Sequence, residues 1–329
     1  MPKKLNLTLA CGDYEIVRPL IDGKVAVDGV DLTILTDMDS ATRHWRFLNN
    51  HEFDVAEVSG SSFLAAHDNG WPVRAIPVFL HRRFRHGFMF INTAKGIGKP
   101  ADLKGRKIGV KTMMTTAVLW MRGMLQSEYG VPLNSIEWFA ELNNDVDVQL
   151  PPDIKCTIVP KDKSVETMLA EGELDAVFHS DFVKPFLAKD PRVARLFPDM
   201  KAEEMAYYKR TGIFPIMHVT GIRKALTEEH PWLAVNLYRA FTEAKAIAMK
   251  RMANPRIVPL AWYRAAWEEQ EALLGPDPWE YGLSEKNRKN LETLVGYSHQ
   301  QGLIKKKPTL EELFISVDQG YKRGGEYRI

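Results

Sequence analysis

Two histidines and one glutamate have the type and setting that acid–base chemistry needs. His86 ends the segment HRRFRH, His218 ends the apolar segment TGIFPIMH, and Glu57 lies in the apolar segment DVAEV. Histidine is the side chain that titrates nearest to neutral pH, and a buried carboxylate is costly unless it is paired or functional. Each residue also has an ordinary explanation, as a core histidine or as a structural salt bridge to an arginine. We treat these three residues as the catalytic candidates.

Cations and hydroxyl groups near the ends of predicted segments are the candidates for binding an anionic ligand. Arginine holds a carboxylate through two parallel hydrogen bonds, and helix N-termini attract anions. Serine and threonine are also common helix caps, and arginine is common in surface turns, so these alternatives stay open. The substrate-binding candidates are Arg18, Ser61, Ser62, Arg82, Arg85, Thr115, Thr116, His179 and Asp181.

The familiar cofactor, nucleophile and metal motifs are missing from the sequence. No G-x-G-x-x-G, P-loop, G-x-S-x-G or H-E-x-x-H pattern occurs. A metal held by His86, His179, His218 and Glu57 is the alternative, but these residues lack the spacing of metal ligands. We therefore predict no metal site.

Composition argues against several kinds of partner. The formal net charge of the 329 residues is only +2, which disfavours a nucleic-acid partner, because such binding needs a basic face. No apolar run reaches the roughly 18 residues of a membrane span, and the first residues lack the apolar core of a secretory signal. We expect a cytoplasmic protein with a small-molecule ligand and no membrane partner. A homo-oligomer stays open, because the sequence shows no interface.

The elements that must hold these residues alternate between strand and helix, the pattern of an α/β fold. Strands are predicted in LNLTLACG, Val30–Leu35, EFDVAEV, VRAIPVFLHR, HGFMFINT, Lys107–Val110, Leu174–Phe178 and Ile213–Thr220. Helices are predicted in ATRHWRFLNN, around Met114–Leu125, between Ser164 and Gly172, from Pro231 to near Met252, and after Pro259 and Ser284. The order predicts two lobes joined by two crossing segments, with a ligand cleft between them. Lobe 1 comprises residues 1–94 and 215–329 with the C-terminal helices, and lobe 2 comprises residues 95–214.

Ten blocks spread along the chain resemble the 4,5-dihydroxyphthalate decarboxylase family. They are CGDYEIVRPLIDGKV, EFDVAEVSGSSFL, AIPVFLHRRFRH, ADLKGRKIGV, EYGV, MLAEGELDAV, DPRVARLFPD, YYKRTGIFPIMH, HPWLA and YSHQQGL. The resemblance implies the two-lobed fold of type 2 periplasmic binding proteins. It also implies a lyase of phthalate and aromatic-compound degradation. Such an enzyme removes CO2 from a dihydroxylated aromatic dicarboxylate to give protocatechuate, without an organic cofactor.

Under this resemblance the candidates take specific roles. His86 and His218 are the acid or base groups, and Glu57 accepts from a phenol hydroxyl or orients a histidine. The arginines bind the carboxylate, with the serines and threonines in support, and His179 and Asp181 are further polar groups of the pocket. The main alternative is a solute-binding protein that captures an aromatic or small carboxylate without catalysis. Another lyase or a cyclase on the same fold is the third reading.

Overall fold

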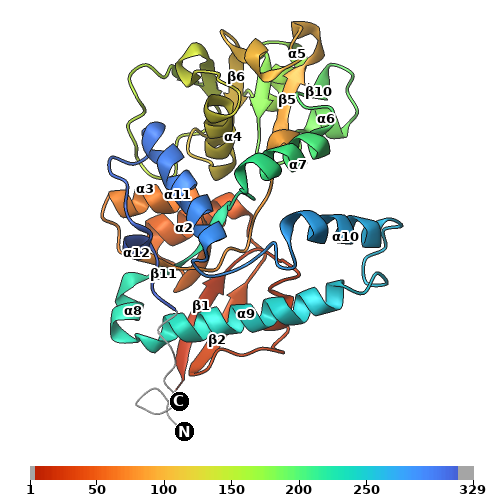
Figure 1. The fold of residues 1–329 in the computed structure, drawn as a ribbon. Coiled ribbons are helices and arrows are strands. Elements are labelled where there is room, and N and C mark those ends of the chain that lie inside the picture. Colours follow the sequence, from red (N-terminus) through yellow and green to blue (C-terminus); the bar gives the residue numbers. More distant parts are fainter. Residues whose placement is uncertain (1–3, 318–329) are drawn as a thin grey trace. The chain divides into compact units, whose positions relative to one another are not determined.

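The computed structural model describes residues 4–317 of the chain. Within this range the chain divides into two compact units (Figure 1). Unit 1 comprises residues 4–82, His218–Leu291 and residues 308–317, and unit 2 comprises Arg83–Met217 and Glu292–Lys307. The chain thus leaves unit 1, builds most of unit 2 and returns, which is the order of a two-lobed fold.

Unit 1 is built on a five-stranded mixed sheet with the strand order β2-β1-β3-β11-β4. Its strands are β1 (Leu5–Ala10), β2 (Val30–Leu35), β3 (Val55–Ser59), β4 (Val73–Ile76) and β11 (His218–Arg223). β1, β2 and β3 run parallel, whereas β11 runs antiparallel to both β3 and β4. β11 therefore inserts a segment from far along the chain between two strands of the N-terminal part.

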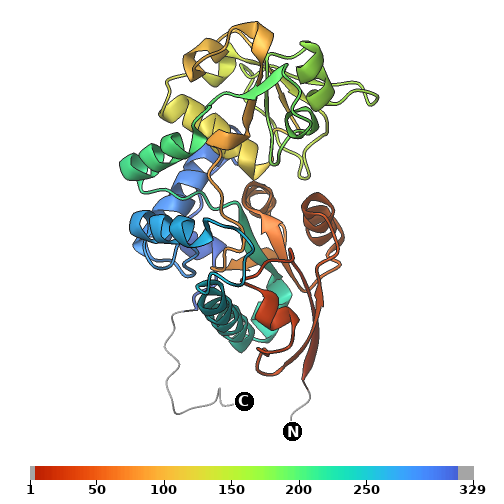
Figure 2. The same cartoon turned by 90° about the vertical axis from the view of Figure 1, so that its right-hand side faces the viewer.

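Helices cover both faces of this sheet. The helices of unit 1 are α1 (Arg18–Ile21), α2 (Ser40–Asn50), α3 (Gly60–Asp68), α8 (Lys224–Glu229), α9 (Trp232–Met252), α10 (Tyr263–Leu274), α12 (Leu310–Leu313) and the first half of α11 (Glu285–Gln300). Ile222 of β11 belongs to one core cluster with Leu237 of α9, whereas a Cβ at Gly221 would lie 2.7 Å from Phe47 of α2. Because neighbouring residues of a strand face opposite sides, α9 and α2 cover opposite faces. Figure 2 views α9 nearly end-on beside the strands.

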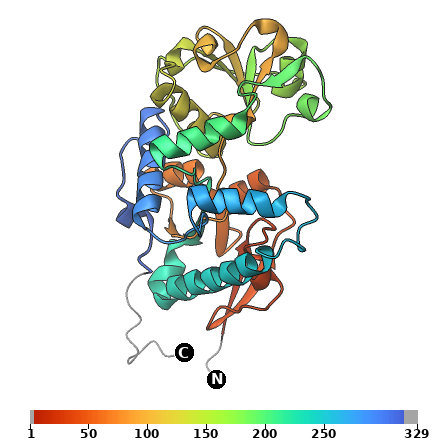
Figure 3. The same ribbon diagram turned by 45° about the vertical axis from the view of Figure 1, so that its right-hand side comes forward.

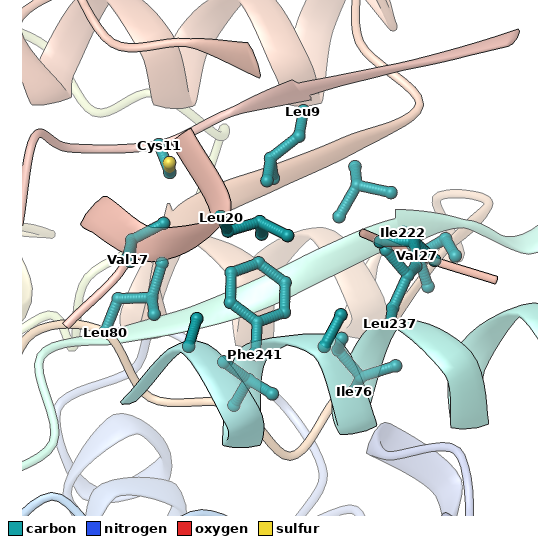
Figure 4. Close-up of a cluster of buried hydrophobic side chains, with 14 of the residues drawn as sticks. Leu9, Cys11, Val17, Leu20, Val27, Ile76, Leu80, Ile222, Leu237 and Phe241 are labelled. Atoms are coloured by element: carbon teal, nitrogen blue, oxygen red, sulfur yellow. The ribbon is translucent and has the colours of Figure 1, made fainter. Parts of the chain in front are cut away.

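The face of the sheet under α9 holds the hydrophobic core of unit 1 (Figure 4). The fully buried ring of Phe241 projects from α9 into the cluster toward Leu20 of α1, and the cluster also contains strand residues such as Leu9 and Ile222. Burying an apolar side chain of this size contributes about 1.5–3 kcal/mol. The cluster thus joins α1, α9 and the strands of the sheet in one core.

Unit 2 contains a six-stranded sheet with the order β10-β5-β9-β6-β7-β8. Its strands are β5 (Met89–Asn92), β6 (Lys107–Val110), β7 (Glu137–Ala140), β8 (Cys156–Ile158), β9 (Ala176–Phe178) and β10 (Val193–Arg195). Its helices are α4 (Thr116–Ser127), α5 (Val165–Glu171), α6 (Lys184–Leu187), α7 (Met200–Thr211) and the second half of α11. The four strands from β9 to β8 are parallel, and β5 runs antiparallel to its neighbours.

Several local predictions are confirmed at the level of single residues. The strands predicted at 30–35 and 107–110 have those bounds. Ser164 caps α5 by accepting a hydrogen bond from the backbone N–H of Thr167, and Gly172 ends the same helix in the left-handed conformation, with φ 79°. Both caps act through nearby backbone atoms, which is why the sequence alone predicts them.

Two strand predictions beside proline residues are wrong in extent. The strand predicted in VRAIPVFLHR ends at Ile76, and the strand predicted from Ile213 begins only at His218. Pro77 and Pro215 lie in the parts that are not strand. Proline has no backbone N–H to donate to a sheet ladder, so the apolar pattern continues where the strand does not.

The unit boundaries differ from the predicted lobe boundaries. The first lies between Arg82 and Arg83 rather than after residue 94, because β5 pairs with β9 and β10 of unit 2. The segment HGFMFINT becomes strand only at Met89, after a short 3-10 helix. The second boundary lies at His218 rather than residue 215, and residues 292–307 also join unit 2.

Candidate active site

Glu57 is the centre of a polar cluster inside unit 1. It is the third residue of β3, and its side chain is fully buried. It lies opposite Thr220 of β11, two residues from His218 on that strand. Side chains two residues apart in a strand share a face, and diagonal neighbours across a sheet are within reach of long side chains. The strand register therefore directs Glu57 and His218 toward each other.

The Glu57 carboxylate accepts hydrogen bonds from four groups. Oε1 accepts from the Tyr14 hydroxyl at 2.8 Å and from Nδ1 of His218 at 2.6 Å. Oε2 accepts from the backbone N–H of Gly12 at 2.8 Å and from Nη2 of Arg43 at 2.6 Å. Two donors at each oxygen match the four lone pairs of a carboxylate. The group is therefore held in one orientation despite its complete burial.

The same contacts keep Glu57 ionised. Burial by itself raises the pKa of this carboxyl, but the charge and hydrogen bond of His218, with the Arg43 guanidinium, outweigh burial and hold the pKa well below its usual range. Arg43 is only 2% exposed and also donates to the carbonyls of Met38 and Glu57. A buried ion pair needs such additional hydrogen bonds to be stable. Glu57 is therefore an anion at neutral pH.

The Glu57 carboxylate holds the ring of His218 in one orientation. Because an ionised carboxylate only accepts hydrogen bonds, Nδ1 of His218 is the donor to Glu57 and carries a hydrogen. A carboxylate in this position fixes the tautomer and the orientation of the imidazole. The His218 side chain is 12% exposed, whereas Glu57 is 0% exposed, so the pair has one buried end and one accessible end.

Two further histidines and a tyrosine surround the His218 ring. The rings of His44, from α2, and His81 each meet it edge to face at a centroid distance of 4.7 Å. The Tyr14 ring stacks on His81 at 6.2 Å. Burial, with the charges of His218 and Arg43, lowers the pKa of His44 well below its ordinary value. The cluster therefore holds a neutral His44 beside a histidine that is paired with a carboxylate.

The other candidates of unit 1 lie in three different settings. Ser61 and Ser62 are buried in the first turn of α3, which follows β3 directly. Arg82 is buried and donates to the side-chain oxygen of Asn287 at 2.5 Å. Arg18 forms an ion pair with an exposed aspartate. Within unit 1 the structure thus brings Ser61 and Ser62 next to the end of β3 that carries Glu57, and it places the two arginines in other contacts.

His86 belongs to unit 2, whereas Glu57 and His218 belong to unit 1. It is fully buried, with the rings of Phe197 and Tyr207 at 5.2 and 5.3 Å. Neither ring nitrogen has a hydrogen-bond partner within residues 4–317. Burial lowers the pKa of His86 to about 4, so this histidine is neutral at physiological pH.

The remaining candidates of unit 2 lie at the ends of its strands and helices. Arg85 is buried and donates to the carbonyl of Ser180 at 2.8 Å. Nδ1 of His179 accepts from the backbone N–H of Asp181, which places both residues in the turn after β9. Thr115 is the N-cap residue of α4 and Thr116 is its first residue. The predicted link between polar groups and element ends is therefore present in unit 2.

The sequence analysis missed Tyr14, Arg43, His44 and His81. A signal existed for two of them, because Arg43 and His44 share the buried face of α2 with Phe47 and Leu48. Polar residues on the apolar face of a helix imply buried partners. Tyr14 and His81 lie in irregular segments, where periodicity gives no such signal.

Other reactive groups of the described chain are few. Within residues 4–317 no three His, Cys, Asp or Glu side chains are grouped so as to hold a metal ion. Burial, with the Glu57 charge as the next cause, raises the pKa of the Cys11 thiol to about 12, so this thiol is protonated and a poor nucleophile. No helix of the same range is long and apolar enough to cross a bilayer.

Comparisons with known proteins agree with this architecture. A family model described as NMT1/THI5 like matches residues 26–150. The periplasmic aliphatic sulphonate binding protein SsuA of Escherichia coli has the same fold, with a TM-score of 0.56 at 13% identity over 96% of this chain and 98% of that chain. The 4,5-dihydroxyphthalate decarboxylase of Comamonas testosteroni is 35% identical over 94% of this chain and 96% of its own length. The enzyme of the same name from Pseudomonas putida is 34% identical over 63% of this chain and 82% of its own length. The chain therefore belongs to the 4,5-dihydroxyphthalate decarboxylase family.

Proposed function

We propose that the chain is a non-oxidative decarboxylase of a hydroxylated aromatic carboxylate. The substrate is 4,5-dihydroxyphthalate or a close analogue, and the products are CO2 and a protocatechuate-like acid. The supporting observation is the hydrogen bond between His218 and Glu57 in a chain whose curated relatives are named for this activity. Loss of CO2 from a ring carbon requires a proton at that carbon, and this pair is built to hold and deliver one.

The proposed reaction replaces a carbon–carbon bond by a carbon–hydrogen bond. Protonated His218 gives the Nε2 proton to the ring carbon that bears the carboxylate, and the para hydroxyl oxygen carries the electron demand of the dienone-like ring. The carbon–carbon bond then breaks, its electron pair restores the aromatic ring, and CO2 leaves. His218 takes a new proton from solvent. The step consumes one proton and no oxidant or reductant.

Glu57 acts in this scheme through His218. Its four hydrogen bonds leave no lone pair for a phenol hydroxyl, so of the two roles predicted for Glu57 the orienting one fits the geometry. The charges of Glu57 and Arg43 cancel, and protonated His218 gives the three residues a net charge of +1. Such a site attracts an aromatic dicarboxylate. Tyr14 and Arg43 are positioning residues, because they contact Glu57.

The phenol and the retained carboxylate each need a partner. We assign the phenol to His81, since its half-buried ring adjoins His218 and stacks with Tyr14. We assign the carboxylate to the first turn of α3, which follows β3 directly and offers backbone N–H groups to an anion. Ser61 and Ser62 would supply hydroxyls there. Roles in catalysis or substrate binding for His86, Arg18, Arg82, Arg85, Thr115, Thr116, His179 and Asp181 stay predictions from the sequence.

Incubation with 4,5-dihydroxyphthalate in deuterated water tests the proposal. We expect release of CO2 and a product with one deuterium at the carbon that lost its carboxylate. His218→Gln should lower turnover at least about a hundredfold while circular dichroism stays unchanged. His299→Gln changes an exposed histidine and serves as the matched control. Turnover near the wild-type value in the His218 variant would exclude its assignment as the acid.

Incubation with 4,5-dihydroxyphthalate and other hydroxybenzoates separates catalysis from ligand binding without catalysis. SsuA is a binding protein of the same fold, so a solute-binding function is the second candidate. Calorimetric binding of 4,5-dihydroxyphthalate or other hydroxybenzoates without release of CO2 would favour that function. Placement in phthalate degradation and in the cytoplasm also stays a prediction, which product analysis and cell fractionation test.

A further inference from the structure

Unit 2 buries one arginine, Arg122, without a counter-charge. It belongs to α4, which lies beside the sheet of unit 2 (Figure 3), and it is only 1% exposed. Its Nη1 lies 3.6 Å from the sulfur of Met113, a weak acceptor, whereas Nε and Nη2 have no hydrogen-bond partner within residues 4–317. A buried charged side chain is costly unless it is paired. We therefore looked for the group that can pair with it.

The two nitrogens without partners form the edge of the guanidinium that binds oxyanions. Nε and Nη2 direct parallel N–H groups to one side, and two oxygens of a single acid group accept from both. The ring of Trp138 in β7 covers the guanidinium, with its centroid 5.7 Å from Cζ of Arg122. Arg122 is thus held against Trp138 and offers two parallel donors.

The thiol of Cys156 lies on the same face of the sheet as the Trp138 ring. Cys156 of β8 is paired with Trp138 in the parallel register of these strands, so both side chains point to the face that Arg122 covers. Burial lowers the pKa of Arg122 to about 10, and Cys156 is the one titratable group of the described chain that acts against this shift. The Cys156 side chain is half-buried and β8 is an edge strand, so a small solute has access to the sulfur.

The reduced thiol leaves Arg122 without a counter-charge, whereas an oxidised one supplies it. Burial raises the pKa of the Cys156 thiol, although Arg122 acts in the opposite direction, so the thiol is neutral at pH 7. Cysteine oxidises first to a sulfenic acid and then to a sulfinic acid. A sulfinic acid is ionised at neutral pH and carries two oxygens on one sulfur, which suits the parallel donors of Arg122.

We propose that Cys156 is a site of oxidation by hydroperoxides and that Arg122 holds the resulting sulfinate. In the first step the sulfur forms a bond to one oxygen of hydrogen peroxide, the O–O bond breaks, and the sulfenic acid and water result. A second peroxide repeats the step and gives the sulfinic acid, which releases its proton to solvent. Each step removes two electrons from sulfur and reduces one peroxide. Cys156 and Arg122 both belong to unit 2, so this site is independent of the proposed catalysis at His218.

Peptide mass spectrometry of the full-length protein after treatment with hydrogen peroxide tests the site. Cys11 is the internal control, because it is fully buried and burial raises the pKa of its thiol to about 12. We expect two added oxygens on Cys156 and an unmodified Cys11. Arg122→Met should slow the oxidation of Cys156 at least about fivefold, because the cation no longer favours the thiolate. Oxidation of Cys11 before Cys156, or an unchanged rate in Arg122→Met, would overturn the proposal.

Thermal unfolding tests the ion pair itself. Peroxide should raise the unfolding midpoint of the wild-type chain by about 2–4 °C relative to Cys156→Ser treated in the same way, because the sulfinate pairs with a buried cation. The Cys156→Ser variant corrects for oxidised methionines. Arg122→Lys keeps the charge without the parallel donors, so Cys156 should still oxidise while the rise falls to less than about half. Equal changes in the wild-type chain and Cys156→Ser would exclude the ion pair.

Discussion

Replacing Glu57 by glutamine removes the charge at the centre of the polar cluster and keeps the size of the side chain. The carboxylate accepts from four donors, whereas an amide has one acceptor oxygen and an NH2 group that can only donate. Two of the four donors therefore lose their acceptor. Arg43, which is 2% exposed, also loses its counter-charge.

The expected cost follows from these two losses. Breaking a buried ion pair from one side costs about 3–5 kcal/mol, and a buried donor without an acceptor costs about 1–3 kcal/mol. Because the two terms describe overlapping contacts, we expect Glu57→Gln to lower the free energy of unfolding by about 3–5 kcal/mol. That is a large part of the free energy of unfolding of a typical domain, which is ~5–15 kcal/mol.

Urea unfolding followed by circular dichroism at neutral pH measures this loss. Asp54→Asn is the control, because Asp54 also accepts from two donors on Thr8 and pairs with Arg223, but its side chain is partly exposed. We expect the control to lose about 1–2 kcal/mol. Adding Arg43→Met to Glu57→Gln should restore part of the stability, since it removes the uncompensated cation. Equal losses in Glu57→Gln and Asp54→Asn, with no recovery in the double variant, would refute the reasoning.

Three smaller changes test other parts of unit 1 and unit 2. The pKa of His86 is about 4 in the folded chain and about 6.5 in an unfolded one, so stability falls as pH drops through this range, by up to ~3 kcal/mol. His86→Phe should make that slope smaller in unfolding midpoints measured against pH, with the rest of the slope due to other groups such as buried His44, and an unchanged slope would contradict the assignment. Gly221→Ala places a Cβ 2.7 Å from Phe47. We expect it to lower the free energy of unfolding, followed by thermal unfolding, by about 1–3 kcal/mol. An unchanged stability would show that α2 moves to make room for the methyl group. Tyr14→Phe removes one of four donors to Glu57 and should cost about 1–2 kcal/mol, with less loss of turnover than His218→Gln in the same assay.

Local signals correctly predicted the helix caps. Apolar runs gave strands that are too long wherever buried residues lie outside the hydrogen-bonded part of a strand. The caps at Ser164 and Gly172 involve backbone atoms a few residues away, so the sequence contains all that is needed. Val78, Phe79 and Leu80 are fully or almost fully buried although they follow the end of β4. Apolar residues report burial, and only backbone hydrogen bonding makes a strand. Pro77 lies between β4 and these buried residues, and the strand ends before it because proline has no backbone N–H to donate.

The candidate site was predictable in its residue types and not in its contacts. Glu57 and His218 were chosen separately, each as a polar residue in an apolar segment, and their hydrogen bond spans 161 positions of the chain. No spacing rule operates over that distance. Arg18 was chosen because arginine binds carboxylates and Tyr14 was missed, yet Tyr14 contacts Glu57 and Arg18 pairs with an exposed aspartate. Residue type thus indicates a chemistry, whereas the partner depends on the fold.

The pairing of Glu57 with His218 depends on the register of β11, and two core residues of that strand set the register. Gly221 lies under the ring of Phe47 on one face of the sheet, and Ile222 packs in the α9 cluster on the other. A slip of one residue would turn His218 to the opposite face. Substitutions at Gly221 or Ile222 are therefore expected to lower turnover without contacting the substrate. Their loss of activity should follow their loss of stability, whereas that of His218→Gln should not.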